Sequence, residues 1–87
     1  MENTEIRVLG IHISHRMKEV AQIQPILTKY GCSIKTRLGL HEVNDNVCST
    51  SGIVLLELIG DVNEMNKLEN ELKSIAGIDV QKMSFKG

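Results

Sequence analysis

One short apolar run constrains the fold of this chain more than any other stretch. Residues 53–59 read IVLLELI, and Glu57 is the single charge among six apolar side chains. Seven residues are too few for an ordinary helix, and the run is rich in β-branched side chains, so a strand is predicted. Successive side chains of a strand point to opposite faces. Both faces of this strand are therefore apolar, and both must be covered.

The segment before this run alternates in a different way. It extends from Cys32 to Glu42, and a polar loop of turn-forming residues, 43–51, follows it. One face carries Ile34, Thr36, Leu38 and Leu40, and the other carries Lys35, Arg37, Gly39 and His41. Such alternation is typical of a half-buried or edge strand, and the loop joins the two strands into a predicted β-hairpin.

Helical patterns occupy two further stretches. The first runs from about residue 15 to 30 and contains Pro25, which removes one helical hydrogen bond. It predicts one kinked helix, and the alternative is a helix that ends near Ile23 and restarts at Pro25. The second begins after Asp61, a predicted N-cap. Its apolar residues recur at spacings of three and four, which is typical of an amphipathic helix: Met65, Leu68, Leu72 and Ile75.

Two outer segments complete the set of strands. Residues 5–13 are predicted to form the first strand, and residues 78–85 the last one, with a change in apolar phase near Gln81. The order is then strand, helix, strand, strand, helix, strand. Right-handed crossovers and this order predict one domain, residues 1–87, with an α+β ferredoxin-like βαββαβ sandwich. We expect a four-stranded antiparallel sheet of order 4-1-3-2 with two helices on one face.

This fold leaves the other face of the sheet open. Because the strand at 53–59 is central and apolar on both sides, something must cover that open face, and a second copy of the chain is the simplest candidate. We therefore expect a homodimer or a higher homo-oligomer with the open face as its contact surface. Arg37, Gly39 and His41 should lie near the rim of this surface, and its centre should hold either Ile53 and Leu55 or Val54 and Leu56, because the sequence does not fix the phase of the strand. Glu57 should lie at the edge of a pocket or pair with Arg7 or Arg37, while Glu69 and Lys73 should pair on the solvent side of the second helix.

Composition limits the function. The chain has 87 residues and a net charge of −1, so no basic excess is available to neutralise phosphates and direct nucleic-acid binding is not expected. We expect no signal peptide and no membrane span. Two cysteines do not make a disulfide framework, which favours a cytoplasmic protein with reduced thiols. Cys32 follows the predicted end of the first helix and is expected to be a small buried apolar residue.

Three stretches together resemble a known family. They are residues 36–41 (TRLGLH), the apolar strand between Gly52 and Gly60, and residues 75–82 (IAGIDVQK). They are similar to the iron-only hydrogenase system regulators, small stand-alone proteins with an ACT-like, ferredoxin-like fold, akin to the C-terminal domain of the nickel-responsive repressor. The resemblance covers nearly the whole chain. It implies a regulatory domain, although no DNA-binding segment is present.

The resemblance also suggests a metal site. The nickel-responsive repressor binds metal through histidines on the second strand and a cysteine near the third, and His41 and Cys48 have roughly comparable places here. Imidazole and thiolate suit nickel or zinc. Gly39 stands where that family has a further histidine. The alternative interpretation is an exposed strand histidine and a loop thiol.

Arg37, Gly39 and His41 form a second candidate group. Arg37 and His41, with Lys35, could receive an anionic ligand or a carboxylate of a partner, and Gly39 could allow a backbone or ligand to approach closely. Alternatively, these charges discourage aggregation at a sheet edge. No catalytic constellation is present in the sequence. We expect a non-enzymatic regulatory or ligand-sensing domain, with a transition-metal sensor using His41 and Cys48 as the alternative.

Overall fold

Every strand and helix expected from the sequence is present in the structure, a computed structural model that describes residues 4–14, 16–40 and 52–87. The elements in chain order are β1 (Glu5–Ile13), α1 (Arg16–Lys29), a short 3₁₀ helix (Gly31–Ser33), β2 (Ile34–Leu40), β3 (Gly52–Leu58), α2 (Val62–Lys73) and β4 (Ile78–Lys86).

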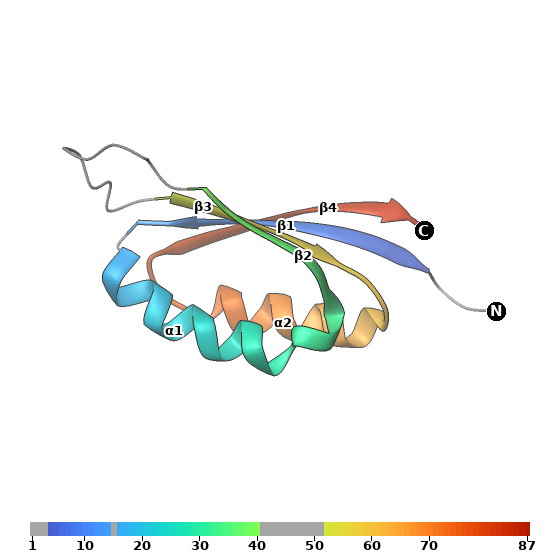
Figure 1. Cartoon of the computed structure of the whole chain (residues 1–87), viewed down its shortest axis with the longest axis horizontal. Helices are drawn as coiled ribbons and strands as arrows, with labels where there is room; N and C mark the ends of the chain where they lie inside the picture. The colour runs from blue at the N-terminus through green and yellow to red at the C-terminus, as the bar shows by residue number, and fades with distance from the viewer. Residues whose placement is uncertain (1–3, 15, 41–51) are drawn as a thin grey trace.

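The sheet has the predicted topology. Its four strands lie in the order β2-β3-β1-β4, which is the predicted order 4-1-3-2 read from the other edge, and all three pairings are antiparallel. Both helices pack on the same face of the sheet, so the structure has two layers (Figure 1). The ferredoxin-like βαββαβ fold is thereby confirmed.

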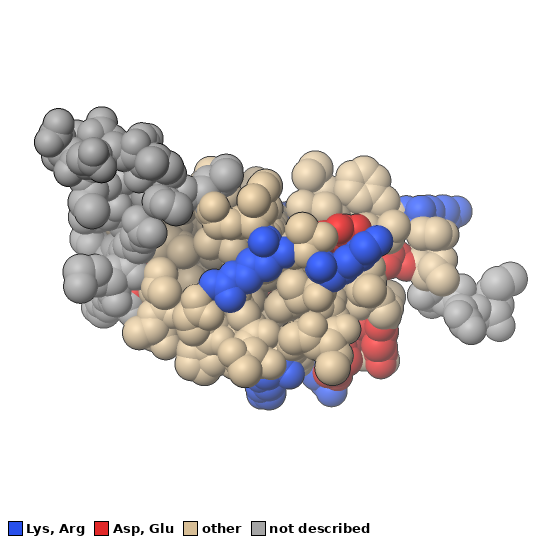
Figure 2. Space-filling model, viewed as in Figure 1, with Lys and Arg blue, Asp and Glu red and all other residues tan. Residues whose placement is uncertain are grey.

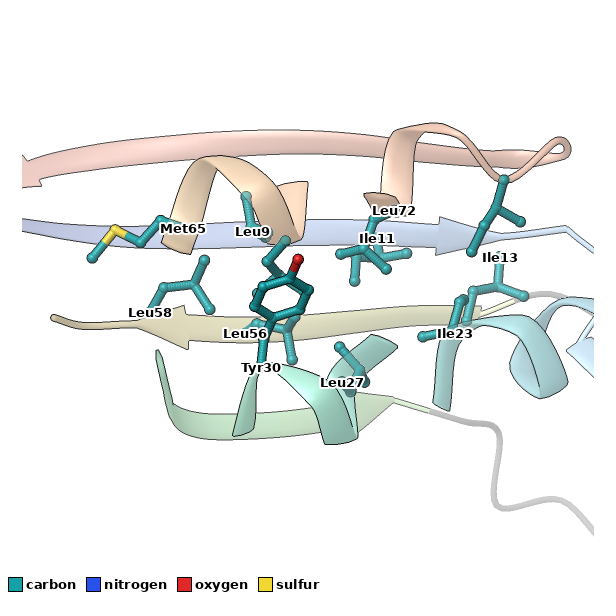
Figure 3. Close-up of a cluster of buried hydrophobic side chains, with 12 residues drawn as sticks. Leu9, Ile11, Ile13, Ile23, Leu27, Tyr30, Leu56, Leu58, Met65 and Leu72 are labelled. Carbon is teal, nitrogen blue, oxygen red and sulfur yellow. The ribbon is translucent and has the colours of Figure 1, made fainter. Parts of the chain in front are cut away.

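The core lies between the sheet and the helices. Side chains of β1 and β3 that point to the helices meet apolar side chains of α1 and α2 (Figure 3). Seven of these side chains are almost fully buried: Leu9, Ile11, Leu56, Leu58, Met65, Leu68 and Leu72. The amphipathic helix predicted after Asp61 is therefore confirmed, and its apolar side is the one that packs on the sheet.

Pro25 lies inside α1 and does not divide it. The helix is continuous from Arg16 to Lys29, so the alternative of a helix that restarts at Pro25 was wrong. A proline removes one backbone donor from a helix. Ile23 and Leu27 on either side of Pro25 are buried in the core, and this packing holds the helix together across the missing bond.

A buried ion pair ties α2 to the sheet. Arg7 Nη1 donates to Glu69 Oε1 at 2.9 Å and to Asn66 Oδ1 at 2.9 Å, and Arg7 Nε donates to Glu5 Oε2 at 2.8 Å. Arg7 is only 4% exposed and Glu69 is equally buried. The expected pairing of Glu69 with Lys73 is present, with Nζ 2.8 Å from Oε2. Its expected place on the solvent side was wrong, because Arg7 draws the carboxylate inward.

The charges around Glu69 shift its titration. Burial raises the pKa of the Glu69 carboxyl. The hydrogen bond from Lys73 and the charges of Lys82, Lys73 and Arg7 together lower this pKa by more than burial raises it, so the net shift is downward. A carboxylate whose pKa is lower in the folded state stabilises the fold above its unfolded pKa. That stability is lost as the pH falls through the folded pKa.

We therefore predict an acid-sensitive contribution from Glu69. Replacing Glu69→Gln should lower the free energy of unfolding at neutral pH by about 3 kcal/mol, because the buried Arg7 loses one of its two carboxylate partners and keeps only Glu5. The variant should also lose less stability than the parent between neutral and acidic pH. Urea unfolding across a pH series measures both quantities.

The exposed pair of Glu64 and Lys67 on the same helix, 3.1 Å apart, supplies the control. Glu64→Gln should cost less than about 1 kcal/mol, since exposed ion pairs contribute little. Equal effects of the two substitutions would contradict the importance of the buried pair.

Gly77 forms a tight junction between the turn before β4 and α1. Its φ is +91°, and a Cβ atom at this position would lie 2.1 Å from Glu19 Oε2. The Gly77 carbonyl accepts from Ser14 Oγ at 2.6 Å, and Glu19 Oε1 accepts from the Ser14 backbone N–H at 3.0 Å. The end of β1 and the first turns of α1 therefore meet the turn before β4, which is distant in the sequence, without room for a side chain.

Two glycine substitutions separate backbone strain from crowding. Gly60 also has a positive φ, +94°, but a Cβ there would meet nothing within 4 Å. Gly60→Ala should cost about 1–2 kcal/mol of unfolding free energy from the left-handed backbone alone. Gly77→Ala should cost about 1–3 kcal/mol more, because it also displaces Glu19. Chemical denaturation of both variants tests this ranking, and an equal loss would contradict it.

Candidate functional site

A β-bulge in β2 decides which side chains reach the open face. Ile34 pairs with Leu58, but Thr36 already pairs with Glu57, so two steps along β2 match one step along β3. Lys35 is the extra residue. Because side chains alternate along a strand, one extra residue exchanges the two faces for everything that follows.

The bulge corrects the predicted face of Arg37 and Gly39. These residues lie opposite Leu56 and Val54, which are on the helix side of the sheet. Arg37 Nη1 donates to Gln24 Oε1 of α1 at 3.1 Å. Their predicted position on the open face was therefore wrong. Their role as ligand contacts is untested and stays a prediction, while His41 lies outside the described residues.

The open face is the side of the sheet that the helices leave uncovered. Residues opposite each other in the antiparallel ladders share a face, so the pairings define its members on each strand: Thr36 and Leu38 on β2; Ile53, Leu55 and Glu57 on β3; Ile6, Val8, Gly10 and His12 on β1; and Asp79, Gln81, Met83 and Phe85 on β4. Ile53 and Leu55 were expected on one face of this central strand, and the pairing with β1 confirms that they share it.

Large apolar side chains are exposed across this face. Met83 is 57% exposed, Phe85 51%, Leu38 50% and Ile53 42%. Val8 and Leu55 lie between them and are half-buried. Scattered apolar residues are ordinary on a surface, but a continuous group of this kind indicates an interaction site.

The apolar residues form a diagonal stripe. It starts at Leu38 and Ile53, crosses Leu55 and Val8, and ends at Met83, Ile6 and Phe85. We call this set the apolar stripe. Two groups of polar side chains flank it. Thr36 and Glu57 form the Glu57 corner, and His12, Asp79 and Gln81 form the Gln81 corner on the opposite side of the stripe.

Glu57 has a local hydrogen-bond partner. Thr36 Oγ1 donates to Glu57 Oε1 at 2.9 Å across the strand pair. The expected pairing with Arg7 or Arg37 was wrong, because both arginines lie on the helix side of the sheet, where they contact Glu69 and Gln24. The carboxylate therefore stands beside an apolar surface with a single neutral donor from its own chain among the described contacts.

The β2 edge of the sheet has a different character. Figure 2 views the molecule from the side along which β2 runs, and Lys and Arg atoms form two groups in the middle of this view. Lys35 and Arg37 are both exposed on this strand. Cations on an edge strand oppose pairing with another strand, so contact through the open face is favoured over extension of the sheet at β2.

The sequence did not reveal the β4 half of the stripe. The apolar phase of β4 changes between Val80 and Met83, but its pairing with β1 is uninterrupted from Glu5 to Ile13. Val80 therefore packs against the core, whereas Met83 and Phe85 face the open side. The phase change was the available signal that Met83 and Phe85 face away from the core, because a strand without a bulge cannot place residues of both phases on one face.

The predicted metal ligands are not tested. His41 and Cys48 both lie outside the described residues, and no group of three or more His, Cys, Asp or Glu side chains that could hold a metal occurs within 4–14, 16–40 and 52–87. Cys32, expected in the interior, is exposed. This correction follows from its place in the 3₁₀ turn, where Ser33 takes the buried position.

An open hollow of about 510 Å³ lies where β1 begins and β4 ends. Its lining includes Glu5, Val62, Ser84 and Phe85. The hydrogen bond from Arg7 lowers the pKa of the Glu5 carboxyl. Among the helices that the structure describes, none is long and apolar enough to cross a membrane.

Solved structures share this fold. The uncharacterized protein TM1266 from Thermotoga maritima matches with a TM-score of 0.79 at 24% identity, covering 95% of this chain and 99% of that one. The ACT domain of a GTP pyrophosphokinase from Chlorobium tepidum matches with a TM-score of 0.67 at 15% identity, covering 92% and 99%. The C-terminal domain of the MgtC protein from Mycobacterium tuberculosis matches with 0.65 at 10% identity, covering 99% and 93%.

These similarities define an ACT-like, ferredoxin-like fold and nothing finer. No family model matches the chain. No curated protein matches it either.

The metal hypothesis has a direct test. If His41 and Cys48 bind nickel or zinc, the untagged protein should bind the metal ion in a titration, and Cys48→Ser should weaken this binding because it removes the thiolate. Cys32→Ser is the matched control and should bind as the parent does. Equal affinity of the parent and Cys48→Ser would show that the hypothesis is wrong.

Proposed function

We propose that this chain is a small, non-enzymatic regulatory domain that senses a ligand and acts as a homo-oligomer through the open face of its sheet. The observation that carries the proposal is the apolar stripe. It is the kind of surface that a stable interface covers, and it lies on the side of the sheet that has no helices.

Burial of the stripe supplies a driving force. A large apolar side chain contributes about 1.5–3 kcal/mol when it moves from full exposure to full burial. Leu38, Ile53, Met83 and Phe85 are each about half exposed in a single copy. A symmetric dimer would bury the same four side chains from both copies. Because an apolar surface is complementary to a second copy of itself, another copy of the chain suits the stripe better than a small ligand does.

The regulatory part of the proposal is supported by the fold and by the resemblance. The sheet and helices have the arrangement of the ACT domain of the GTP pyrophosphokinase, a domain attached to an enzyme. The family resemblance adds a role related to iron-only hydrogenase system regulators, with a small-molecule effector. The net charge of −1 supports the absence of direct nucleic-acid binding, and the two cysteines support a cytoplasmic location. A transition metal held by His41 and Cys48 is the form of effector for which the sequence offers specific residues.

The oligomer can be tested by one substitution on the stripe. Light scattering should show the parent as a dimer or a larger oligomer at micromolar concentrations. Leu38→Asp should dissociate it into folded monomers, because Leu38 is already half exposed in the single copy and a carboxylate there opposes apolar contact. Circular dichroism verifies that the variant is folded.

Ala21→Asp is the control. Ala21 is an exposed residue on α1, so the substitution adds the same charge on the opposite layer of the molecule and should leave the oligomer intact. A parent that is a monodisperse monomer would overturn the proposal. So would a Leu38→Asp variant that keeps both the oligomer size and the melting temperature of the parent.

A further inference from the structure

We infer that the second copy docks with the two-fold axis along the apolar stripe, so that Glu57 of each copy faces Gln81 of the partner subunit. This inference rests on the proposed function, since it assumes that the open face is the interface. It adds the orientation of the two copies and the polar contact that fixes it.

The direction of the stripe follows from the strand register. Leu38 and Gln81 lie in the same row across the sheet, because both are aligned with Leu55 and Gly10. Phe85 is four residues further along β4, and β4 is three strands away from β2. With about 3.4 Å per residue and about 4.8 Å between strands, the stripe crosses the sheet at roughly 45° to the strands.

Only two face-to-face arrangements superimpose the stripe of one copy on that of the other. In both, the two-fold axis lies between the sheets, either along the stripe or at right angles to it. Other directions place apolar side chains over the Glu57 corner or the Gln81 corner, and a buried charge against an apolar surface is unfavourable. The choice between the two arrangements is made by the polar corners.

An axis at right angles to the stripe places each polar corner over the equivalent corner of the partner subunit. Glu57 would then face Glu57 of the partner subunit, and Asp79 would face Asp79 of the partner subunit. Two like charges close together in a partly dehydrated interface repel each other strongly. This arrangement is therefore unfavourable on both sides of the stripe.

An axis along the stripe exchanges the corners. Each Glu57 corner then lies over the Gln81 corner of the other copy, and the positions that come closest are Glu57 and Gln81. The sheets would cross at roughly 90°, which is one of the two usual angles for packed sheets. Asp79, on the edge strand, is the member of the Gln81 corner furthest from the axis and stays at the solvent-exposed rim.

The hydrogen-bonding groups match in this arrangement. Glu57 is an acceptor that holds one bond, from Thr36. The Gln81 side-chain amide donates to Asp79 Oδ2 at 3.3 Å, and its nitrogen carries a second N–H. That second N–H can donate to Glu57 of the partner subunit. His12 lies in the same corner and can contribute a further donor.

Substitutions of opposite charge at Gln81 test the contact. Gln81→Glu places a like charge opposite Glu57 and should raise the dimer dissociation constant at least tenfold, roughly what one close charge pair is worth in a partly dehydrated site. Gln81→Lys should lower the constant instead. Adding Glu57→Lys to Gln81→Glu should restore dimerisation. Analytical ultracentrifugation at low salt measures all of these constants, and Gln22→Glu and Gln22→Lys, on exposed α1, are the matched controls.

Cross-linking tests the orientation independently. In a background with Cys32→Ser and Cys48→Ser, a short bifunctional thiol reagent should link a mixture of the Glu57→Cys and Gln81→Cys proteins into a dimer, because sheets that pack face to face lie about 10 Å apart and facing cysteines come within reach of the reagent. Under the alternative axis, Glu57→Cys alone would cross-link to itself. Charge effects of the same sign for Gln81→Glu and Gln81→Lys, or self-linking by Glu57→Cys alone, would overturn the orientation.

The two levels of the proposal fail in different ways. A monomeric parent, or a parent oligomer that Leu38→Asp leaves intact, removes the open-face interface altogether. If Leu38→Asp dissociates the oligomer while Gln81→Glu behaves as Gln22→Glu does, the interface stands and only the orientation is wrong.

Discussion

Two helices can cover only one side of a four-stranded sheet, and the rest of this structure depends on that constraint. The helices and the inward side chains of β1 and β3 complete a core in which Leu9, Leu56 and Leu68 are inaccessible to solvent. The same central strands carry apolar side chains on their other face as well. The domain therefore has a closed core on one side of the sheet and exposed apolar side chains on the other.

The sequence predicted the fold because its signals are local and periodic. The run at 53–59 and the apolar side of α2 each contain enough residues to identify one element, and the order of elements restricts the topology. The environment of Glu69 was missed because Arg7 is 62 residues away in the chain, whereas the spacing to Lys73 is visible within one helical turn.

The candidate site was predicted in part. Ile53 and Leu55 were recognised as one face of the central strand because alternation fixes their relation to each other. The predicted position of Arg37 and Gly39 at the rim of the open face was wrong because the sequence does not mark the bulge at Lys35. Neither glycine nor proline stands there, and the alternation of β2 looks regular when it is counted from Ile34. Met83 and Phe85 were missed because the phase change in β4 does not by itself show which of the two apolar phases faces the helices.

The bulge gives one backbone position control over the identity of a whole surface. Were Lys35 paired as an ordinary member of the ladder, the alternation after Ile34 would keep its original phase. Leu38 would then turn toward the helices and Arg37 would lie on the outer side of the sheet, although the sequence would be the same. Whether β2 presents Leu38 or Arg37 on the open face therefore depends on whether this one residue is bulged, and the order of the strands is the same in both cases.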